Sequence, residues 1–281
     1  PEYRAVRAEV GGFKDLLMTP DRAAEVTLQP IEAYGVDAAI LFSDILVVPE
    51  AMGLPYNLVE KVGPRFPETI RSGADLKRLK EVDPSTDLKY VLDAIRVILD
   101  ELNGTVPLIG FAGAPWTLFC YMVEGKGSKD WTLARRMLWE EPALSDALLS
   151  AITKATESYL HAQVDAGVHL IQLFDSWAGS LSRKDMIHAD CRIMSDSESV
   201  KLTVVIGMIN REATATKVLC TVVINRHIGT SVIRAEPEKK SIGGRINFRN
   251  DFERPVAIVR AGPSGIGAFY PAATVTGIHD I

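Results

Sequence analysis

The sequence is poor in the features that mark membrane, secreted and metal-binding proteins. No apolar run reaches about 18 residues, and no signal peptide is recognisable. The three cysteines, Cys120, Cys191 and Cys220, have no CxxC spacing, and the five histidines have no metal-ligand spacing. These absences lead us to expect a cytoplasmic protein with no membrane partner, no disulfide framework and no metal.

Positive charge is also scarce. The formal net charge is −5 at pH 7, so no overall positive field attracts nucleic acid or an acidic membrane. The 281 residues are 47% hydrophobic and 24% charged, which is the composition of a soluble globular protein. This length suits one α/β barrel or two modest domains.

Apolar runs of strand length alternate with helical patterns along the first two thirds of the chain. Strands are expected at residues 36–43, 106–111 and 168–174. Helices are expected at 73–80, with Ser72 as a cap, and at 86–103, 115–124, 128–139 and 142–166. This alternation is typical of a parallel α/β protein, but it does not distinguish a closed barrel from an open sheet.

The apolar stretch AAILFSDILVVPEAMG, residues 38–53, is interrupted by Asp44. A carboxylate at the end of a buried strand loses hydration, so it requires hydrogen-bond donors or a substrate. In an α/β barrel the carboxyl ends of the strands carry the chemistry. Asp44 is therefore a candidate functional residue, and the alternative is an aspartate that caps a helix or braces a loop.

Several motifs place Asp44 in a family context. SDILVVPEAMGLP, GFAGAPWTLFCYMVEGKGSKD (110–130) and QLFDSWAGSL (172–181) resemble the uroporphyrinogen decarboxylase family, as do PEYRAVRAEVGGF and ETIRSGADLKRL (68–79). The likeness keeps the family's order over residues 1–183. It implies that these residues form part of a (β/α)8 TIM barrel, an incomplete one, and that the protein is a homodimer that uses no cofactor.

The resemblance also implies a reaction and the residues that carry it. The family removes CO2 from the four acetate side chains of uroporphyrinogen III, giving coproporphyrinogen III in porphyrin and heme biosynthesis. Asp44 matches the acid that accepts hydrogen bonds from the pyrrole N–H groups and stabilises the positive charge developing on the ring. Tyr121 matches a tyrosine near a substrate carboxylate, and Ser176 matches a serine that hydrogen-bonds a substrate side chain. The residues alone also allow a core aromatic at Tyr121 and a strand-end or capping serine at Ser176.

Two features of the family have no counterpart in this sequence. These are the arginines of an RQAGRY motif before PEYR, and a late histidine between two glycines. A substrate with eight carboxylates needs dense local positive charge. We therefore expect impaired decarboxylation, with a non-catalytic half-barrel remnant as the alternative.

Residues 184–281 do not share the resemblance and are expected to form a divergent or foreign tail. Their net charge is +3, against −8 for residues 1–183. KLTVVIGMI (201–209) and KVLCTVVI (217–224) predict strands. A foreign splice, a frame-shifted reading and a divergent end all stay open as explanations.

The tail segment RPVAIVRAGPSGIGAF, residues 254–269, resembles the opening of a flavin- or nicotinamide-binding oxidoreductase. Its glycine fingerprint is broken, because Arg260 stands where the tight turn requires the first glycine. An oxidoreductase fragment is therefore the less favoured alternative.

Overall fold

The computed structural model describes residues 2–182, Asp185 and Ala189, and the backbone of four strands at 203–207, 218–223, 257–259 and 269–271. Its first elements are the helices α1 (Glu2–Glu9), α2 (Phe13–Leu17) and α3 (Pro20–Tyr34). Next come β1 (Ala39–Ile40), α4 (Val47–Ala51), β2 (Asn57–Val59), β3 (Gly63–Arg65), α5 (Gly73–Leu76), α6 (Pro84–Asp87) and α7 (Lys89–Leu102). The next elements are β4 (Leu108–Gly113), α8 (Pro115–Glu124), α9 (Thr132–Glu140), α10 (Pro142–Ala166), β5 (Leu170–Asp175) and the 3-10 helix η1 (Ala178–Ser180). The tail contains β6 (Thr203–Gly207), β7 (Val218–Val223), β8 (Ala257–Val259) and β9 (Phe269–Pro271).

The main sheet has the strand order β1-β4-β5-β7-β6. β1, β4 and β5 are parallel neighbours, and helical crossovers connect them, as in a β/α barrel. β7 pairs antiparallel with β5, and β6 pairs antiparallel with β7. Within the described residues, the parallel repeat therefore comprises three strands.

The tail strands bear out two predictions made from sequence. β6 and β7 lie within the segments 201–209 and 217–224, as expected. The glycine-rich segment 254–269 lies outside the described residues, apart from the backbone of β8 and the first residue of β9.

The first strand is much shorter than residues 36–43, so that prediction of its length was wrong. The N–H of Leu41 still donates to the carbonyl of Ile109 on β4, at 3.0 Å. At the next pairing position, the buried side-chain amide of Gln163 on α10 bonds both backbone groups of Phe111. Its oxygen accepts the Phe111 N–H at 3.0 Å, and its nitrogen donates to the Phe111 carbonyl at 2.8 Å. A Cβ atom at Gly110 would lie 2.3 Å from the Gln163 Oε1 atom, so a larger residue there would displace the amide. By alternation from Pro107 and Ile109, these Phe111 groups are the ones that would pair with a longer first strand, and the Gln163 amide takes their place as partner.

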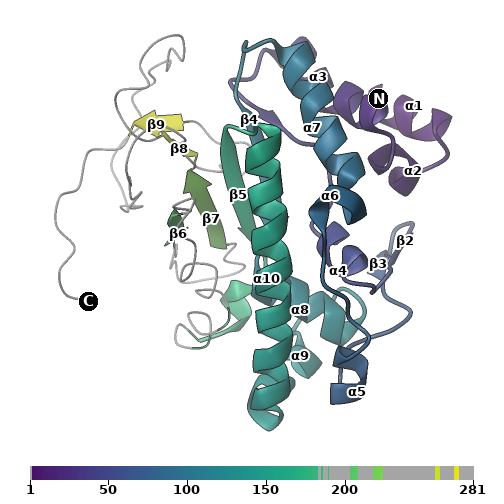
Figure 1. The fold of residues 1–281 in the computed structure, drawn as a ribbon, viewed down its shortest axis with the longest axis vertical. Helices are drawn as coiled ribbons and strands as arrows, with labels where there is room; N and C mark the ends of the chain where they lie inside the picture. Colours follow the sequence, from purple (N-terminus) through teal and green to yellow (C-terminus); the bar gives the residue numbers. More distant parts are fainter. Residues whose placement is uncertain are drawn as a thin grey trace.

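The long helices match the predicted ones most closely, and the bounds expected for α8 and α10 are confirmed. α10 packs against β4, while α3 packs against α7 (Figure 1). Both faces of β4 are buried, because all six of its residues lie in the core. This burial explains its continuous apolar sequence.

Three helices differ from their expected bounds for local reasons. The helix expected at 86–103 is divided, because Leu88 has non-helical dihedral angles between α6 and α7. The helix expected at 128–139 begins only at Thr132, because Trp131 adopts a left-handed conformation with φ 50°. α5 keeps the predicted Ser72 cap, whose side chain accepts from the N–H of Asp75, but it ends at Leu76.

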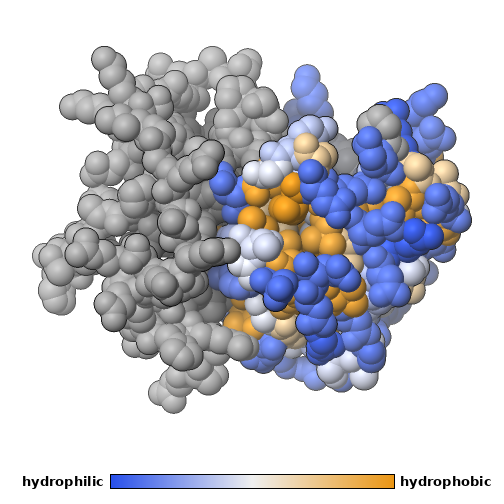
Figure 2. Space-filling view, turned by 90° about the horizontal axis from the view of Figure 1, so that it is seen from above, coloured by the Kyte–Doolittle hydropathy of each residue, from blue (hydrophilic) through white to orange (hydrophobic). Residues whose placement is uncertain are grey.

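The surface of the described residues mixes hydrophilic side chains with an apolar area that is visible from above (Figure 2). The hairpin of β2 and β3 carries three exposed apolar side chains: Leu58, Val59 and Val62. Within the described residues, no helix combines the length and apolar character needed to cross a membrane.

Candidate active site

Asp44 lies at the carboxyl end of β1, just before α4, and is partly buried. Its Oδ1 atom accepts the backbone N–H of Leu46 at 3.1 Å. Its Oδ2 atom accepts the hydroxyl of Tyr56 at 2.6 Å. An ionised carboxylate has about four acceptor positions, so each oxygen keeps capacity for a further donor. The residue does brace its loop, and it still has free acceptor capacity.

Tyr56, which we did not single out from the sequence, is the side chain most tightly bound to Asp44. It is buried, and its ring centroid lies 5.6 Å from that of Phe66. The Nζ atom of Lys14 lies over the Tyr56 ring, 4.1 Å from its centroid. Lys14 also forms an ion pair with Glu50. Burial, reinforced by the negative charge of Asp44, raises the pKa of Tyr56, so its hydroxyl stays protonated and donates.

Tyr121 lies on α8 and is partly buried against two tryptophans. Its ring centroid is 5.2 Å from that of Trp131 and 6.4 Å from that of Trp177. Burial raises the pKa of Tyr121, and the Asp44 carboxylate raises it further. Asp44 therefore lies close enough to Tyr121 for its charge to act on the phenol.

Ser176 follows β5 directly, at the same edge of the sheet as Asp44. Its backbone N–H donates to the Thr117 hydroxyl at 3.0 Å, and that hydroxyl donates to the buried Asp175 at 2.8 Å. Asp175 also accepts the N–H of Ala178 at 3.1 Å. Asp175 thus ties the start of α8 to the end of β5 and caps η1. The parallel strands β1, β4 and β5 bring the segments that carry Asp44, Tyr121 and Ser176 to one edge.

A connecting segment, residues 66–71, covers the end of α8 and contacts the Tyr56 ring. The N–H of Phe66 donates to the carbonyl of Gly125 at 2.8 Å. Arg71 Nε donates to the carbonyl of Val123 at 2.9 Å. This bond gives a carbonyl in the last turn of α8 a partner and places a positive charge at the carboxyl end of the helix, where it is favourable. This segment fixes Phe66, and through it the ring of Tyr56.

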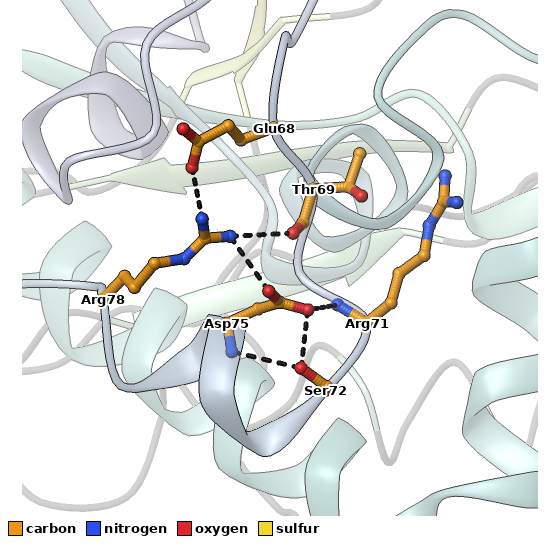
Figure 3. A network of polar contacts seen from close by, with 6 residues as sticks. All are labelled: Glu68, Thr69, Arg71, Ser72, Asp75 and Arg78. Atoms are coloured by element: carbon orange, nitrogen blue, oxygen red, sulfur yellow. Dashed lines mark hydrogen bonds and ion pairs between the residues drawn. The ribbon is translucent and has the colours of Figure 1, made fainter.

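The segment is anchored by a surface network at the start of α5 (Figure 3). Asp75 accepts the backbone N–H of Arg71 at 3.1 Å and the hydroxyl of Ser72 at 2.7 Å. Arg78 bridges Asp75 and Glu68, at 3.0 and 2.5 Å. These groups are largely exposed, so the network contributes to local order more than to stability.

No group of three or more histidine, cysteine, aspartate and glutamate side chains in the described part of the chain could hold a metal ion. Asp44, Tyr121 and Ser176 supply a carboxylate and two hydroxyl groups, a set suited to hydrogen bonding with a polar organic molecule. Nothing near Ser176 in these contacts resembles a base that would activate a nucleophile.

The family assignment follows from comparison with known proteins. A family model described as uroporphyrinogen decarboxylase (URO-D) matches residues 1–195. The chain belongs to the uroporphyrinogen decarboxylase family. This confirms the resemblance recognised in the motifs around Asp44, Tyr121 and Ser176.

Curated members of the uroporphyrinogen decarboxylase family are similar over the same region. The uroporphyrinogen decarboxylase of Alkalilimnicola ehrlichii is 52% identical over 182 residues, which cover 65% of this chain and 50% of that protein. The uroporphyrinogen decarboxylase of Pseudomonas aeruginosa is 52% identical over 183 residues, covering 65% of this chain and 52% of that protein. The chain thus spans about half the length of the curated relatives it matches.

A solved structure supports the fold. A methyltransferase from Methanosarcina mazei superposes with a TM-score of 0.51 at 22% identity, covering 66% of this chain and 54% of that one. Together with the family match and the three parallel strands, this likeness gives the chain a TIM-barrel-like fold that is incomplete.

Proposed function

We propose that this protein takes part in the cofactor-independent decarboxylation of uroporphyrinogen III to coproporphyrinogen III, with Asp44 as its catalytic residue. The observation that carries the proposal is the free acceptor capacity of Asp44, which lies at the carboxyl end of β1 with one donor on each oxygen. The pyrrole N–H groups of a tetrapyrrole are donors of the kind that this carboxylate can accept.

Loss of CO2 from an acetate side chain leaves an electron pair that needs an acceptor. Protonation of a pyrrole carbon next to the ring nitrogen makes the ring cationic and able to take this pair as the carbon–carbon bond breaks. The methylene carbon then gains a proton to become a methyl group, and the ring releases the proton it had gained. A carboxylate fixed beside the N–H groups stabilises the cationic ring without reorganising.

Tyr121 and Ser176 are the proposed contacts of the substrate's carboxylate side chains. Tyr121 lies on α8, the helix that follows β4, and Ser176 directly follows β5; both fall within residues 1–195, which match the family model. A cytoplasmic homodimer and a functional unit at residues 1–183, with a separate segment at 184–281, complete the proposal. The resemblance to the family supports the cytoplasmic homodimer. The difference in net charge between residues 1–183 and 184–281 supports the division into two segments.

Anaerobic incubation with uroporphyrinogen III, followed by separation of the products by carboxylate number, tests the proposal. We expect products with seven to four carboxylates, and about 10²- to 10³-fold slower turnover for Asp44→Asn. Asp37→Asn is the matched control, because it makes the same change at an exposed position before β1. Turnover unaffected by Asp44→Asn would refute the role of Asp44, and absence of product from the unaltered chain would favour the non-catalytic half-barrel.

A further inference from the structure

A tyrosine outside the three proposed site residues makes the shortest hydrogen bond to the Asp44 carboxylate. The hydroxyl of Tyr56 lies 2.6 Å from Asp44 Oδ2, and the N–H of Leu46 lies 3.1 Å from Oδ1. One donor on each oxygen fixes the plane of the carboxylate as well as its position. A hydrogen bond to an ionised acceptor is also stronger than one between neutral groups.

The Tyr56 ring is itself held on two sides. Phe66 packs against it with ring centroids 5.6 Å apart, and the ammonium group of Lys14 lies 4.1 Å from its centroid. Lys14 is in turn paired with Glu50, on α4. A cation over an aromatic face is an attractive contact, so α2 and α4 both restrain the ring. The donor that faces Asp44 therefore has little freedom to turn away.

A second tyrosine shows that proximity to Asp44 does not by itself create this contact. Burial raises the pKa of Tyr90, and the charges of Glu50 and Asp44 raise it further, so this phenol also lies near both acids. Among the described hydrogen bonds, however, only the Tyr56 hydroxyl is a phenol that donates to Asp44. Tyr90 is therefore a natural control for the loss of a hydroxyl in this region.

We propose that Tyr56 is a positioning residue, which holds the Asp44 carboxylate in the orientation that accepts the N–H groups of the tetrapyrrole. This role rests on the proposed function. Together, the Tyr56 hydroxyl and the Leu46 N–H leave about two acceptor positions of the carboxylate open, one on each oxygen. Lys14 supports Tyr56 through the ring and has no direct contact with Asp44 in the described hydrogen bonds and ion pairs.

A double-mutant cycle on the full chain tests this role. Tyr56→Phe keeps the ring under Lys14 and removes only the hydroxyl, and we expect it to lower kcat/KM for uroporphyrinogen III about 10- to 100-fold. Tyr90→Phe is expected to change kcat/KM by no more than about twofold. In the Asp44→Asn background, Tyr56→Phe should change the residual kcat/KM by less than about twofold, because its effect acts through that carboxylate.

Thermal unfolding of each variant separates this role from a general loss of structure. Lys14→Met is a second variant at a partly exposed position, and we expect it to lower kcat/KM about two- to fivefold without loss of folded protein. An unchanged kcat/KM in Tyr56→Phe, or an equal loss in the Asp44→Asn background, would overturn the positioning role alone. An unaltered chain that neither binds nor converts uroporphyrinogen III would overturn the proposed function, and the role of Tyr56 with it.

Discussion

Replacing Gln163 with methionine tests the reason that we give for the short first strand. Methionine has a similar length but no hydrogen-bonding amide, so Gln163→Met leaves the N–H and carbonyl of Phe111 without the partners found at 3.0 and 2.8 Å. Each buried, unpaired backbone group costs about 1–3 kcal/mol. The free energy of unfolding should therefore fall by about 2–6 kcal/mol.

Urea denaturation measures this loss directly. With a slope of about 2 kcal/mol per molar urea, the midpoint should move down by about 1–3 M. Gln29→Met is the matched control, because Gln29 also lies on a helix but makes no hydrogen bond through its side chain in the described contacts. Its effect should stay within about 0.5 kcal/mol.

A second substitution checks that the glycine and the glutamine act together. Gly110→Ala places a methyl group 2.3 Å from Gln163 Oε1, which displaces the amide from Phe111. The two losses should then overlap, so the double variant is less destabilised than the sum of the single ones. Additive losses, or a fall below about 0.5 kcal/mol for Gln163→Met, would refute the explanation.

Two further predictions concern a buried carboxylate and the buried phenols. Glu124 accepts the first N–H groups of α9 at 2.7 and 3.3 Å, so Glu124→Ala should lower the free energy of unfolding by about 1–2 kcal/mol, whereas Glu124→Gln retains an acceptor and should lower it less. Equal losses in a denaturation experiment would count against the cap. Burial raises the pKa of Tyr56, Tyr90 and Tyr159, so the folded chain keeps these protons when the unfolded chain releases them. Stability from this source is complete below about pH 10 and falls above it, by up to about 1.4 kcal/mol per pH unit for each phenol. Urea midpoints measured above about pH 10, with phenolate absorbance followed in parallel, should show this loss of stability. A midpoint independent of pH would contradict the prediction.

Local sequence signals located the long elements well. Pro115 and Pro142 open α8 and α10 at the first helical turn, and Gly125 and Gly167 end them in left-handed conformations, so both helices are bounded by residues typical of helix ends. The motif around Asp44 likewise located a carboxylate at a strand end. These features depend on neighbours within a few residues.

Contacts between residues far apart in the sequence could not be predicted from such local signals. Gln163 and Phe111 are 52 positions apart, and nothing in the apolar run around Ile40 shows that a side chain from α10 will interrupt its pairing. Tyr56 follows Asp44 by 12 positions, in a segment without periodicity, and its hydroxyl reaches the carboxylate only because α4 turns the chain back. A phenol shortly after a strand-end acid was the one signal that could have pointed to it.

The antiparallel pairing of β7 with β5 changes how the sheet supplies loops to the edge that holds Asp44. Each strand of a parallel repeat delivers one connection to that edge, because every strand runs in the same direction. In an antiparallel pair, two strands share one connection at that edge. Here the amino end of β7 lies beside the carboxyl end of β5, and the carboxyl end of β6 lies beside the amino end of β7. Beyond β5, each strand therefore provides half as many connections in which functional side chains can be placed.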